Sequence, residues 1–386
     1  MRILYAALDQ RVPGTTGGSV HVTSVAEGLA ALGHDVDVLT TPGDGPFPAG
    51  RVRWHAMAPP LGLRHLRFLR LASVRAFARA ARAEVVIERY YNFGGEGIEA
   101  AKATGALSVL EVNAPIIDYP GSPKARLDRA LIVEPMRRWR DRQCRQADLL
   151  VTPTAAIVPG FVPASRVVEI EWGADTDRFR PDVTGAIPFV RRPGATLAVF
   201  AGAFRAWHGA IGLVRAIRTL RDRGRQDIDA VLIGDGPELA GARGEAAGID
   251  GLTFTGALPH ALVPACLAAA DIGVAPFDTA AHPPLQLAFY WSPLKVFEYM
   301  AAGLPVVAPR IPRLASIVGS GREGVLYDAD APGALADALA QLADAPDDRR
   351  RYGAAARERA VREFSWAAHC GRLDRAIRQA ADRRAR

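Results

Sequence analysis

The sequence has few of the residues that cross-link small folds or bind nucleic acid. Its three cysteines, Cys144, Cys266 and Cys370, are far apart, which argues against a zinc site or a disulfide framework and fits a reducing cytoplasm. Aromatic residues make up only 7% of the chain, and no helix-turn-helix, finger or RNP-like pattern appears, so no nucleic-acid partner is expected. The opening apolar run at 3–8 is far shorter than a membrane span and predicts a buried strand.

Positive charge, in contrast, is in excess. The chain has 48 Lys and Arg against 41 Asp and Glu, a formal charge of +7 and a pI of about 9.6. This balance favours phosphate-bearing ligands or an anionic membrane surface. With 386 residues, 49% of them hydrophobic, the chain can form two domains with separate cores.

Short apolar runs alternate with helical stretches along the chain. Strands are expected at 2–8, 35–40, 85–87, 107–112 and 149–152, and again at 196–201, 229–233, 252–255, 272–275, 306–308 and 324–327. Such alternation predicts an α/β fold with parallel sheets. A stretch rich in Pro, Gly and Arg at 180–194 predicts a linker between two similar halves.

The most informative stretch is WSPLKVFEYMAAGLPVVA at 291–308. Ser292 suits an N-cap and Pro293 a first helical position, and Gly303 would end a helix of about ten residues. A helix that begins in this way can bind an anion through its unpaired N–H groups and its partial positive charge. Glu298, about a turn and a half along, can accept hydrogen bonds from two ribose hydroxyls. On local physics alone, a capped structural helix with an exposed Glu298 is an equally good interpretation.

This segment resembles the donor-binding element of retaining glycosyltransferases of family 4, which have the two-domain GT-B fold. Further segments are similar to family motifs in the same order over nearly the whole chain. They are Gly17–Gly18, WGAD at 172–175 with Phe179, AGAFRAWHG at 201–209, GDGP at 234–237 and FSW at 364–366.

The resemblance implies two Rossmann-like domains that face each other across a cleft. The N-terminal acceptor domain would cover 1–182, the linker 183–194 and the donor domain 195–364, with about 365–386 crossing back as a last helix. The implied reaction moves a hexose from a nucleotide-diphosphate donor to an acceptor of unknown identity, with retention and with neither a metal nor a cofactor. The implied location is the cytoplasm or, peripherally, the inner face of the membrane.

The resemblance also assigns roles to individual residues. The catalytic candidates are Arg205, His208 and Asn113. The donor-binding candidates are Gly17, Gly18, Arg205, His208, Gly234, Gly236, Ser292, Pro293, Leu294, Lys295 and Glu298. Arg205 suits phosphate through its fork of donors, whereas for His208 and Lys295 a solvated side chain is an equally good interpretation.

The chain departs from the family pattern at several of these positions. Tyr290 stands eight residues before Glu298, where the family has a second glutamate, and Asn113 stands where it has a histidine. Ala203 and His208 replace the usual Arg and Lys of the basic loop. These departures keep a non-catalytic nucleotide-sugar binding protein open as an alternative, and a sugar-nucleotide epimerase of the same fold is a further one.

A dinucleotide-dependent oxidoreductase is a weaker alternative. Asp35 and Asp37 follow the glycine loop by about twenty residues, as a dinucleotide fingerprint requires, but PGTTGGS lacks its G-x-G-x-x-G spacing. Both aspartates are more simply explained as polar positions of an edge strand.

Acceptor binding is expected where strands 85–87 and 107–112 end, since open α/β sheets bind ligands there. The candidates are Glu88, Arg89, Tyr90 and Glu111, and a buried Glu–Arg pair that holds two loops is at least as good an interpretation. The stretch 63–82 predicts an amphipathic helix that can contact an anionic membrane. Its arginines Arg64, Arg67, Arg75, Arg79 and Arg82 share an arc with Phe68 and Leu71. A solvated helix is the favoured alternative for this stretch.

Overall fold

The computed structural model covers residues 1–386. It describes all of them except Thr15, Arg64, His65, Arg67, Phe68, Phe93, Pro120, Ile132, Leu287 and Ala288. The chain forms an N-terminal unit, made of Met1–Trp172, Tyr290–Ser292 and Trp366–Arg386, and a C-terminal unit, made of Gly173–Phe289 and Pro293–Ser365. The expected linker at 183–194 therefore lies within the C-terminal unit.

The N-terminal unit is built on a seven-stranded sheet in which the described strand pairs are all parallel. Its order is β3-β2-β1-β4-β5-β6-β7. The strands are β1 (Arg2–Val12), β2 (Asp35–Pro42), β3 (Arg53–Ala56), β4 (Val85–Arg89), β5 (Leu107–Glu111), β6 (Leu149–Thr152) and β7 (Val167–Glu169). The order reverses between β1 and β4, which is the point where such sheets bind ligands.

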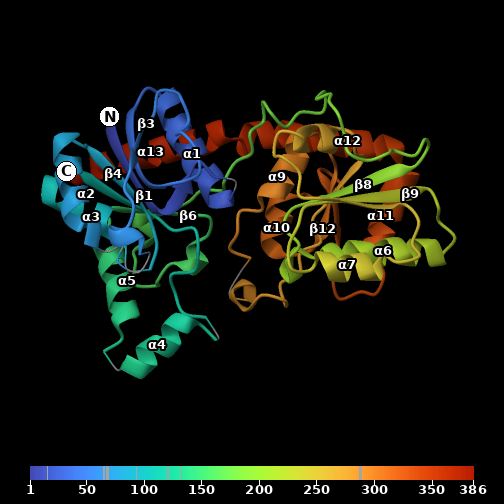
Figure 1. Ribbon diagram of the computed structural model, residues 1–386, viewed down its shortest axis with the longest axis horizontal. Coiled ribbons are helices and arrows are strands. Elements are labelled where there is room, and N and C mark those ends of the chain that lie inside the picture. The colour runs from blue at the N-terminus through green and yellow to red at the C-terminus, as the bar shows by residue number, and fades with distance from the viewer. Residues whose placement is uncertain are drawn as a thin grey trace. The chain divides into compact units, whose positions relative to one another are not determined.

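Two groups of helices cover this sheet (Figure 1). The helices are α1 (Gly17–Ala31), α2 (Leu71–Ala80), α3 (Glu96–Thr104), α4 (Pro123–Leu131), α5 (Pro135–Gln146) and α13 (Trp366–Ala385). Val74 and Ala78 of α2 pack with Leu4 and Val86 of the sheet in one buried cluster. Helix α13 packs on α1 so closely that a Cβ at Gly28 would lie 2.4 Å from the Cys370 sulfur. The last helix thus returns to the N-terminal unit, as the family resemblance implies.

The C-terminal unit repeats this architecture with six strands in the order β10-β9-β8-β11-β12-β13. The strands are β8 (Thr196–Ala201), β9 (Ile228–Ile233), β10 (Leu252–Gly256), β11 (Ile272–Val274), β12 (Val306–Pro309) and β13 (Gly324–Tyr327). The helices are α6 (Ala210–Asp222), α7 (Leu239–Glu245), α8 (Val263–Ala268), α9 (Leu294–Ala301), α10 (Pro312–Ile317), α11 (Ala334–Asp344) and α12 (Pro346–Glu363). Both units have the order reversal of a Rossmann-like fold, so the expected α/β fold class is confirmed.

Two local expectations are corrected. Strand β2 is flanked by β3 and is not the edge, and Asp37 binds Arg53 at 2.8 Å and His55 at 2.8 Å on that neighbouring strand. Among the described residues of 63–82 an α-helix is present only at Leu71–Ala80, and it ends shortly before Arg82, where the chain turns with a left-handed φ of 48°. Arg64, Arg67 and Phe68 lie outside the described residues. None of the helices in the described part of the chain is long and apolar enough to cross a membrane.

Candidate donor and acceptor sites

The expected donor loops meet at one edge of the C-terminal sheet. The loops after β8 and β9 are joined by backbone hydrogen bonds from Gly202 N–H to Ile233 O and from Phe204 N–H to Asp235 O, both 2.9 Å. A Cβ at Gly234 would lie 1.9 Å from the Gly202 oxygen, and one at Gly236 would lie 2.7 Å from the Phe204 oxygen. Both glycines also have positive φ, so no other residue fits without strain. The glycines therefore let the backbones of the two loops pack directly against each other.

Helix α9 begins beside these loops, but not as the sequence predicts. It begins at Leu294, and Pro293 is its N-cap without a side-chain hydrogen bond. The Ser292 hydroxyl instead donates to Glu171 at 2.6 Å and accepts from the Trp172 N–H at 3.0 Å. The N-cap prediction for Ser292 is wrong, because its hydroxyl has partners about 120 residues away in sequence. The first N–H groups of α9, at Leu294 and Lys295, still lack acceptors within the helix.

Lys295 is the most unusual side chain of the C-terminal unit. It is buried, and its Nζ has no hydrogen-bond partner among the described residues. The ammonium group lies 4.0 Å from the ring centre of Phe200 and 5.3 Å from that of Phe277. Burial lowers the pKa of Lys295 to about 7. A buried ammonium without a partner is costly, so its neighbourhood is suited to receive an anion.

Glu298 stands one turn after Lys295 on α9 and is half-buried. Burial raises the pKa of its carboxyl to about 7, although the charges of Lys295 and Arg178 act in the opposite direction. No described residue donates a hydrogen bond to this carboxylate, so its oxygens can accept from ligand hydroxyls. The helix itself is anchored by the Tyr299 hydroxyl, which accepts from the Ala201 N–H at 2.7 Å.

Arg205 and His208 lie near Lys295 but differ in solvent exposure and in charge. The Arg205 side chain is exposed, lies over Trp207 at 5.3 Å, and forms no ion pair with any described residue. The His208 Nδ1 is 2.8 Å from the Ala203 oxygen and must donate to it, so the neutral ring has its lone pair on Nε2. Burial, with the Lys295 charge, lowers the pKa of His208 to about 3. His208 is therefore a neutral group at physiological pH, and it does not replace the positive charge of the Lys that the family has in this loop.

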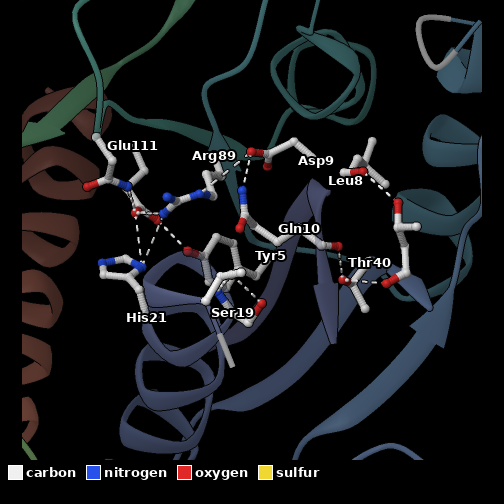
Figure 2. Close-up of polar contacts among 12 residues, drawn as sticks. Tyr5, Leu8, Asp9, Gln10, Ser19, His21, Thr40, Arg89 and Glu111 are labelled. Carbon is white, nitrogen blue, oxygen red and sulfur yellow. Dashed lines mark hydrogen bonds and ion pairs between the residues drawn. The ribbon is translucent and has the colours of Figure 1, made fainter. Parts of the chain in front are cut away.

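A buried polar cluster occupies the carboxyl ends of β1, β4 and β5 in the N-terminal unit (Figure 2). Arg89 donates to Glu111 at 3.1 Å and to the His21 Nδ1 at 3.3 Å, and its Nε lies 3.9 Å from Asp9. The Tyr5 hydroxyl also donates to Glu111. Burial raises the pKa of Glu111 and lowers that of His21, which leaves the histidine neutral. Arg89 and Glu111 thus form the buried pair that the sequence left open as an alternative to acceptor binding.

The other acceptor-side candidates have different surroundings. Glu88 is fully buried and accepts from the N–H groups of Gly95 and Ile98, so it caps α3. Burial, with the charge of Glu96, raises its pKa to about 8. Tyr90 is half-buried, and its hydroxyl donates to Asn92 at 3.3 Å. Of the two, Tyr90 is the better placed to contact a ligand.

Asn113 and the glycine loop border this cluster. The Asn113 amide donates to Glu111 and accepts from the Trp172 indole at 2.8 Å, so both ends of the side chain are held in place. Gly17 and Gly18 are the first residues of α1. A Cβ at Gly18 would lie 2.0 Å from the Gln10 side-chain oxygen, so glycine lets the helix begin close to the end of β1.

The comparisons with known proteins agree with this architecture. Residues 16–173 match the profile of the glycosyl transferase 4-like domain, and residues 195–345 match that of glycosyl transferases group 1. The chain belongs to glycosyltransferase family 4. This family transfers sugars from nucleotide-diphosphate donors.

Several curated proteins resemble this glycosyltransferase in sequence. D-inositol 3-phosphate glycosyltransferase 2 of Catenulispora acidiphila is 28% identical over 94% of this chain and 90% of its own length. The D-inositol 3-phosphate glycosyltransferase of Corynebacterium glutamicum is 33% identical over 54% of this chain, and the match spans half of its own length. A 2-deoxystreptamine N-acetyl-D-glucosaminyltransferase of Streptomyces fradiae is 28% identical over 64% of this chain and 61% of its own length.

Solved structures show the same fold. Sucrose-phosphate synthase of Thermosynechococcus elongatus superposes with a TM-score of 0.73 at 19% identity, over 98% of both chains. Anabaena HepE, solved in complex with UDP, superposes with a TM-score of 0.68 at 16% identity, over 98% of this chain and 100% of its own. The glycosyltransferase therefore has the GT-B fold.

Part of the glycosyltransferase's N-terminal polar cluster has no clear signal in the sequence. Tyr5, Asp9 and His21 were not expected to join Arg89 and Glu111. Asp9 and Tyr5 belong to β1, and strand alternation is the signal that places the two side chains on one face of the sheet. His21 gives no such signal, because its neighbours come from four separate segments of the chain.

Proposed function

We propose that the glycosyltransferase binds the diphosphate of its donor next to Lys295 and the donor ribose at Glu298. The Lys295 ammonium, which has no hydrogen-bond partner among the described residues, supports this proposal, because it lies beside the N-terminus of α9 and the loops after β8 and β9. There the ammonium, the helix N–H groups and the exposed Arg205 can jointly stabilise the leaving diphosphate. Retention and independence of metal ions are part of the proposal. The described residues contain no group of three or more His, Cys, Asp or Glu that could hold a metal ion.

We propose a polyhydroxylated ring as the acceptor. The named relatives act on inositol 3-phosphate and 2-deoxystreptamine, both six-membered carbocycles with several hydroxyls. The half-buried Tyr90 would contact this acceptor, and Arg89, Asn113 and Glu111 would hold the surrounding sheet edge in place. The location proposed for the enzyme is the cytoplasm.

A donor and acceptor panel tests the activity. A nucleotide sugar at 100 times its Kd is expected to add about 2.7 kcal/mol of stability, which a thermal-shift panel detects. With that donor present, inositol phosphates and aminocyclitols are expected to gain the mass of one hexose. A donor that binds while no acceptor changes mass would instead support the non-catalytic binding protein, and a donor whose sugar is isomerised would support the epimerase.

We also propose peripheral contact with an anionic membrane. The part of α2 that the structure describes supports this only weakly. Arg75 pairs with Glu99 at 3.3 Å, while Arg79 and Arg82 are exposed. The hairpin of α4 and α5 is better suited, since residues 123–145 contain eight basic and three acidic residues. Figure 1 shows α4 beyond α5, away from the sheet of its own unit.

The hairpin also offers apolar side chains that can enter a lipid surface. Leu127, Leu131 and Val133 are 41%, 48% and 55% exposed. Asp128, the acidic residue between them, is buried because it accepts from the N–H groups of Met136 and Arg137 at 2.8 and 2.9 Å. Basic and apolar exposure on one helix pair is typical of interfacial segments.

Sedimentation with vesicles tests this contact. Vesicles with anionic lipid are expected to bind the protein at low salt and to release it at high salt, whereas neutral vesicles do not bind it. The double variant Leu131→Asp with Val133→Asp is expected to abolish binding. The double variant Arg79→Glu with Arg82→Glu serves as the matched test of α2 and is expected to weaken binding only partly. Equal sedimentation of the hairpin variant and the parent would contradict the role of the hairpin.

A further inference from the structure

The loop after β8 has a single permanent cation in this chain. The family pattern has an Arg and a Lys in the loop, where Ala203 and His208 stand, and the pKa of His208 is lowered to about 3, so its ring is neutral. Arg205 is therefore the one permanently charged side chain that residues 201–209 can offer to a diphosphate. An exposed arginine loses much rotamer freedom when it is fixed on a ligand. A feature that restricts the free side chain of Arg205 would therefore favour binding.

The ring of Trp207 provides such a restriction. The guanidinium carbon of Arg205 lies 5.3 Å from the ring centre, within the range of a cation–π contact. The Arg205 side chain is exposed and forms no hydrogen bond or ion pair with any described residue. An aromatic face attracts a guanidinium without using its N–H groups, so all five donors stay available for phosphate oxygens.

Trp207 is itself held by the loop after β11. The His282 ring stacks on the indole, with ring centres 4.3 Å apart and an angle of 28° between the planes. The Asp278 N–H donates to the Trp207 oxygen at 3.1 Å, and the Asp278 carboxylate accepts from the Ala280 N–H at 2.9 Å, which fixes the turn that leads to His282. Burial, with the charge of Arg205, lowers the pKa of His282, so the stacked ring is neutral beside the guanidinium.

The two loops lie where the strand order of the C-terminal sheet reverses. Strands β8 and β11 are parallel neighbours, and the chain enters both loops from the carboxyl ends of these strands. A Cβ at Gly209 would lie 1.7 Å from the Pro276 oxygen, so the loops pack directly against each other. A Cβ at Gly202, where the first loop begins, would lie 2.9 Å from the Lys295 Nζ. Open α/β sheets bind ligands at such a reversal, so the stacked residues stand in the region of the proposed donor site.

We propose that Trp207 is a positioning residue that orients Arg205 toward the donor diphosphate and is itself held in place by His282. The role rests on the proposed function, because it requires the diphosphate to lie within reach of Arg205. The indole would keep the guanidinium within a narrow range of orientations before the donor arrives, so that binding costs less conformational entropy. The stack of the three side chains would in this way compensate for the two basic residues that the loop lacks.

Calorimetry with UDP, GDP and ADP as probes tests this role through a double-mutant cycle. For the diphosphate that binds best, Arg205→Met is expected to weaken binding about tenfold, which corresponds to one hydrogen bond to a charged group. Trp207→Leu is expected to weaken binding about two- to fivefold, which corresponds to an exposed cation–π contact. In the Arg205→Met protein, Trp207→Leu is expected to have no additional effect, because the ring then has no guanidinium to orient.

Further variants separate orientation from folding. Trp207→Phe retains an aromatic face and is expected to keep most of the parent's affinity. His282→Ala is expected to weaken binding less than Trp207→Leu does, and only when Arg205 is present. Arg243→Met is the matched control, because Arg243 is an exposed arginine of the same unit that lies 6.0 Å from the ring centre of Phe254. This control should bind the diphosphate as the parent does.

The outcomes distinguish the positioning role from the proposed donor site. Parent-like binding in Trp207→Leu, together with weakened binding in Arg205→Met, would overturn the positioning role and leave the donor site intact. An equal loss from Trp207→Leu with and without Arg205 would also overturn this role, because the effect would then be structural. Parent-like binding in Arg205→Met would overturn both the positioning role and the contact of Arg205 with the diphosphate.

Discussion

Replacing Lys295 with methionine is expected to weaken nucleoside diphosphate binding by about 30- to 3,000-fold. Loss of one partner of a desolvated charge pair costs about 2–5 kcal/mol, and about 1.4 kcal/mol corresponds to a factor of ten. In the ligand-free protein the same change removes a buried ammonium that has no partner among the described residues, so thermal stability is expected to rise. Calorimetry with the free nucleoside diphosphate and a thermal melt measure the two effects.

The pH dependence of binding provides an independent check on Lys295. Its pKa is lowered to about 7 by burial, and only the protonated form attracts the diphosphate. Affinity is therefore expected to fall as the pH rises above 7, and this fall should disappear in Lys295→Met. His208→Asn is the control, because the pKa of His208 is already lowered to about 3 and the ring is neutral over the whole range. Parent-like affinity in Lys295→Met would refute the proposed position of the diphosphate.

Replacing Glu298 with alanine is expected to weaken the nucleoside diphosphate by about ten- to a few hundred-fold. A hydrogen bond to a charged group contributes about 1.5–3 kcal/mol, and the ribose can donate two. Glu298→Gln should cost less, since one acceptor remains. Burial raises the pKa of Glu298 to about 7, so the parent is expected to lose affinity as the pH falls below 7 and the carboxylate is protonated.

A deoxy ligand makes this test specific to the ribose. The parent is expected to prefer the nucleoside diphosphate over its 2′-deoxy form, and Glu298→Ala is expected to bind the two more equally. A chelator is expected to change neither titration, because the proposed site uses protein cations in place of a metal. Retention of the full preference for the ribose in Glu298→Ala would show that another group holds the hydroxyls.

The larger strands of both sheets could be predicted from the sequence because they are continuous apolar runs. Strands β6, β8 and β13 begin and end where the pattern predicts. Strands β3 and β7 were missed, since they are short and their residues are only half-buried or exposed. Such strands are stabilised by the neighbour they pair with, and that information is absent from a local pattern.

The candidate site was predictable to the extent that it depends on local geometry. The glycine loops and α9 are local, and the structure brings them together. The partner of Ser292 and the burial of Lys295 are set by residues far away in sequence, so capping preference and residue type gave no guide to either. The role of Glu88 could not be predicted for the same reason. A carboxylate at the end of a strand is typical of a ligand-binding residue, and only the structure shows that Glu88 caps α3.

The packing of β11 against α9 makes the donor site sensitive to substitutions at positions that carry no charge. Strand β11 passes so close beneath this helix that one methyl group added at Gly273 would lie 2.6 Å from a ring carbon of Tyr299. The ring would have to shift, and with it the hydroxyl that fixes α9 to the end of β8. A natural variant that has lost the ability to bind its donor can therefore retain every polar residue of the site. Substitutions of the small apolar residues of the sheet can cause such a defect as readily as substitutions of the groups that contact the nucleotide.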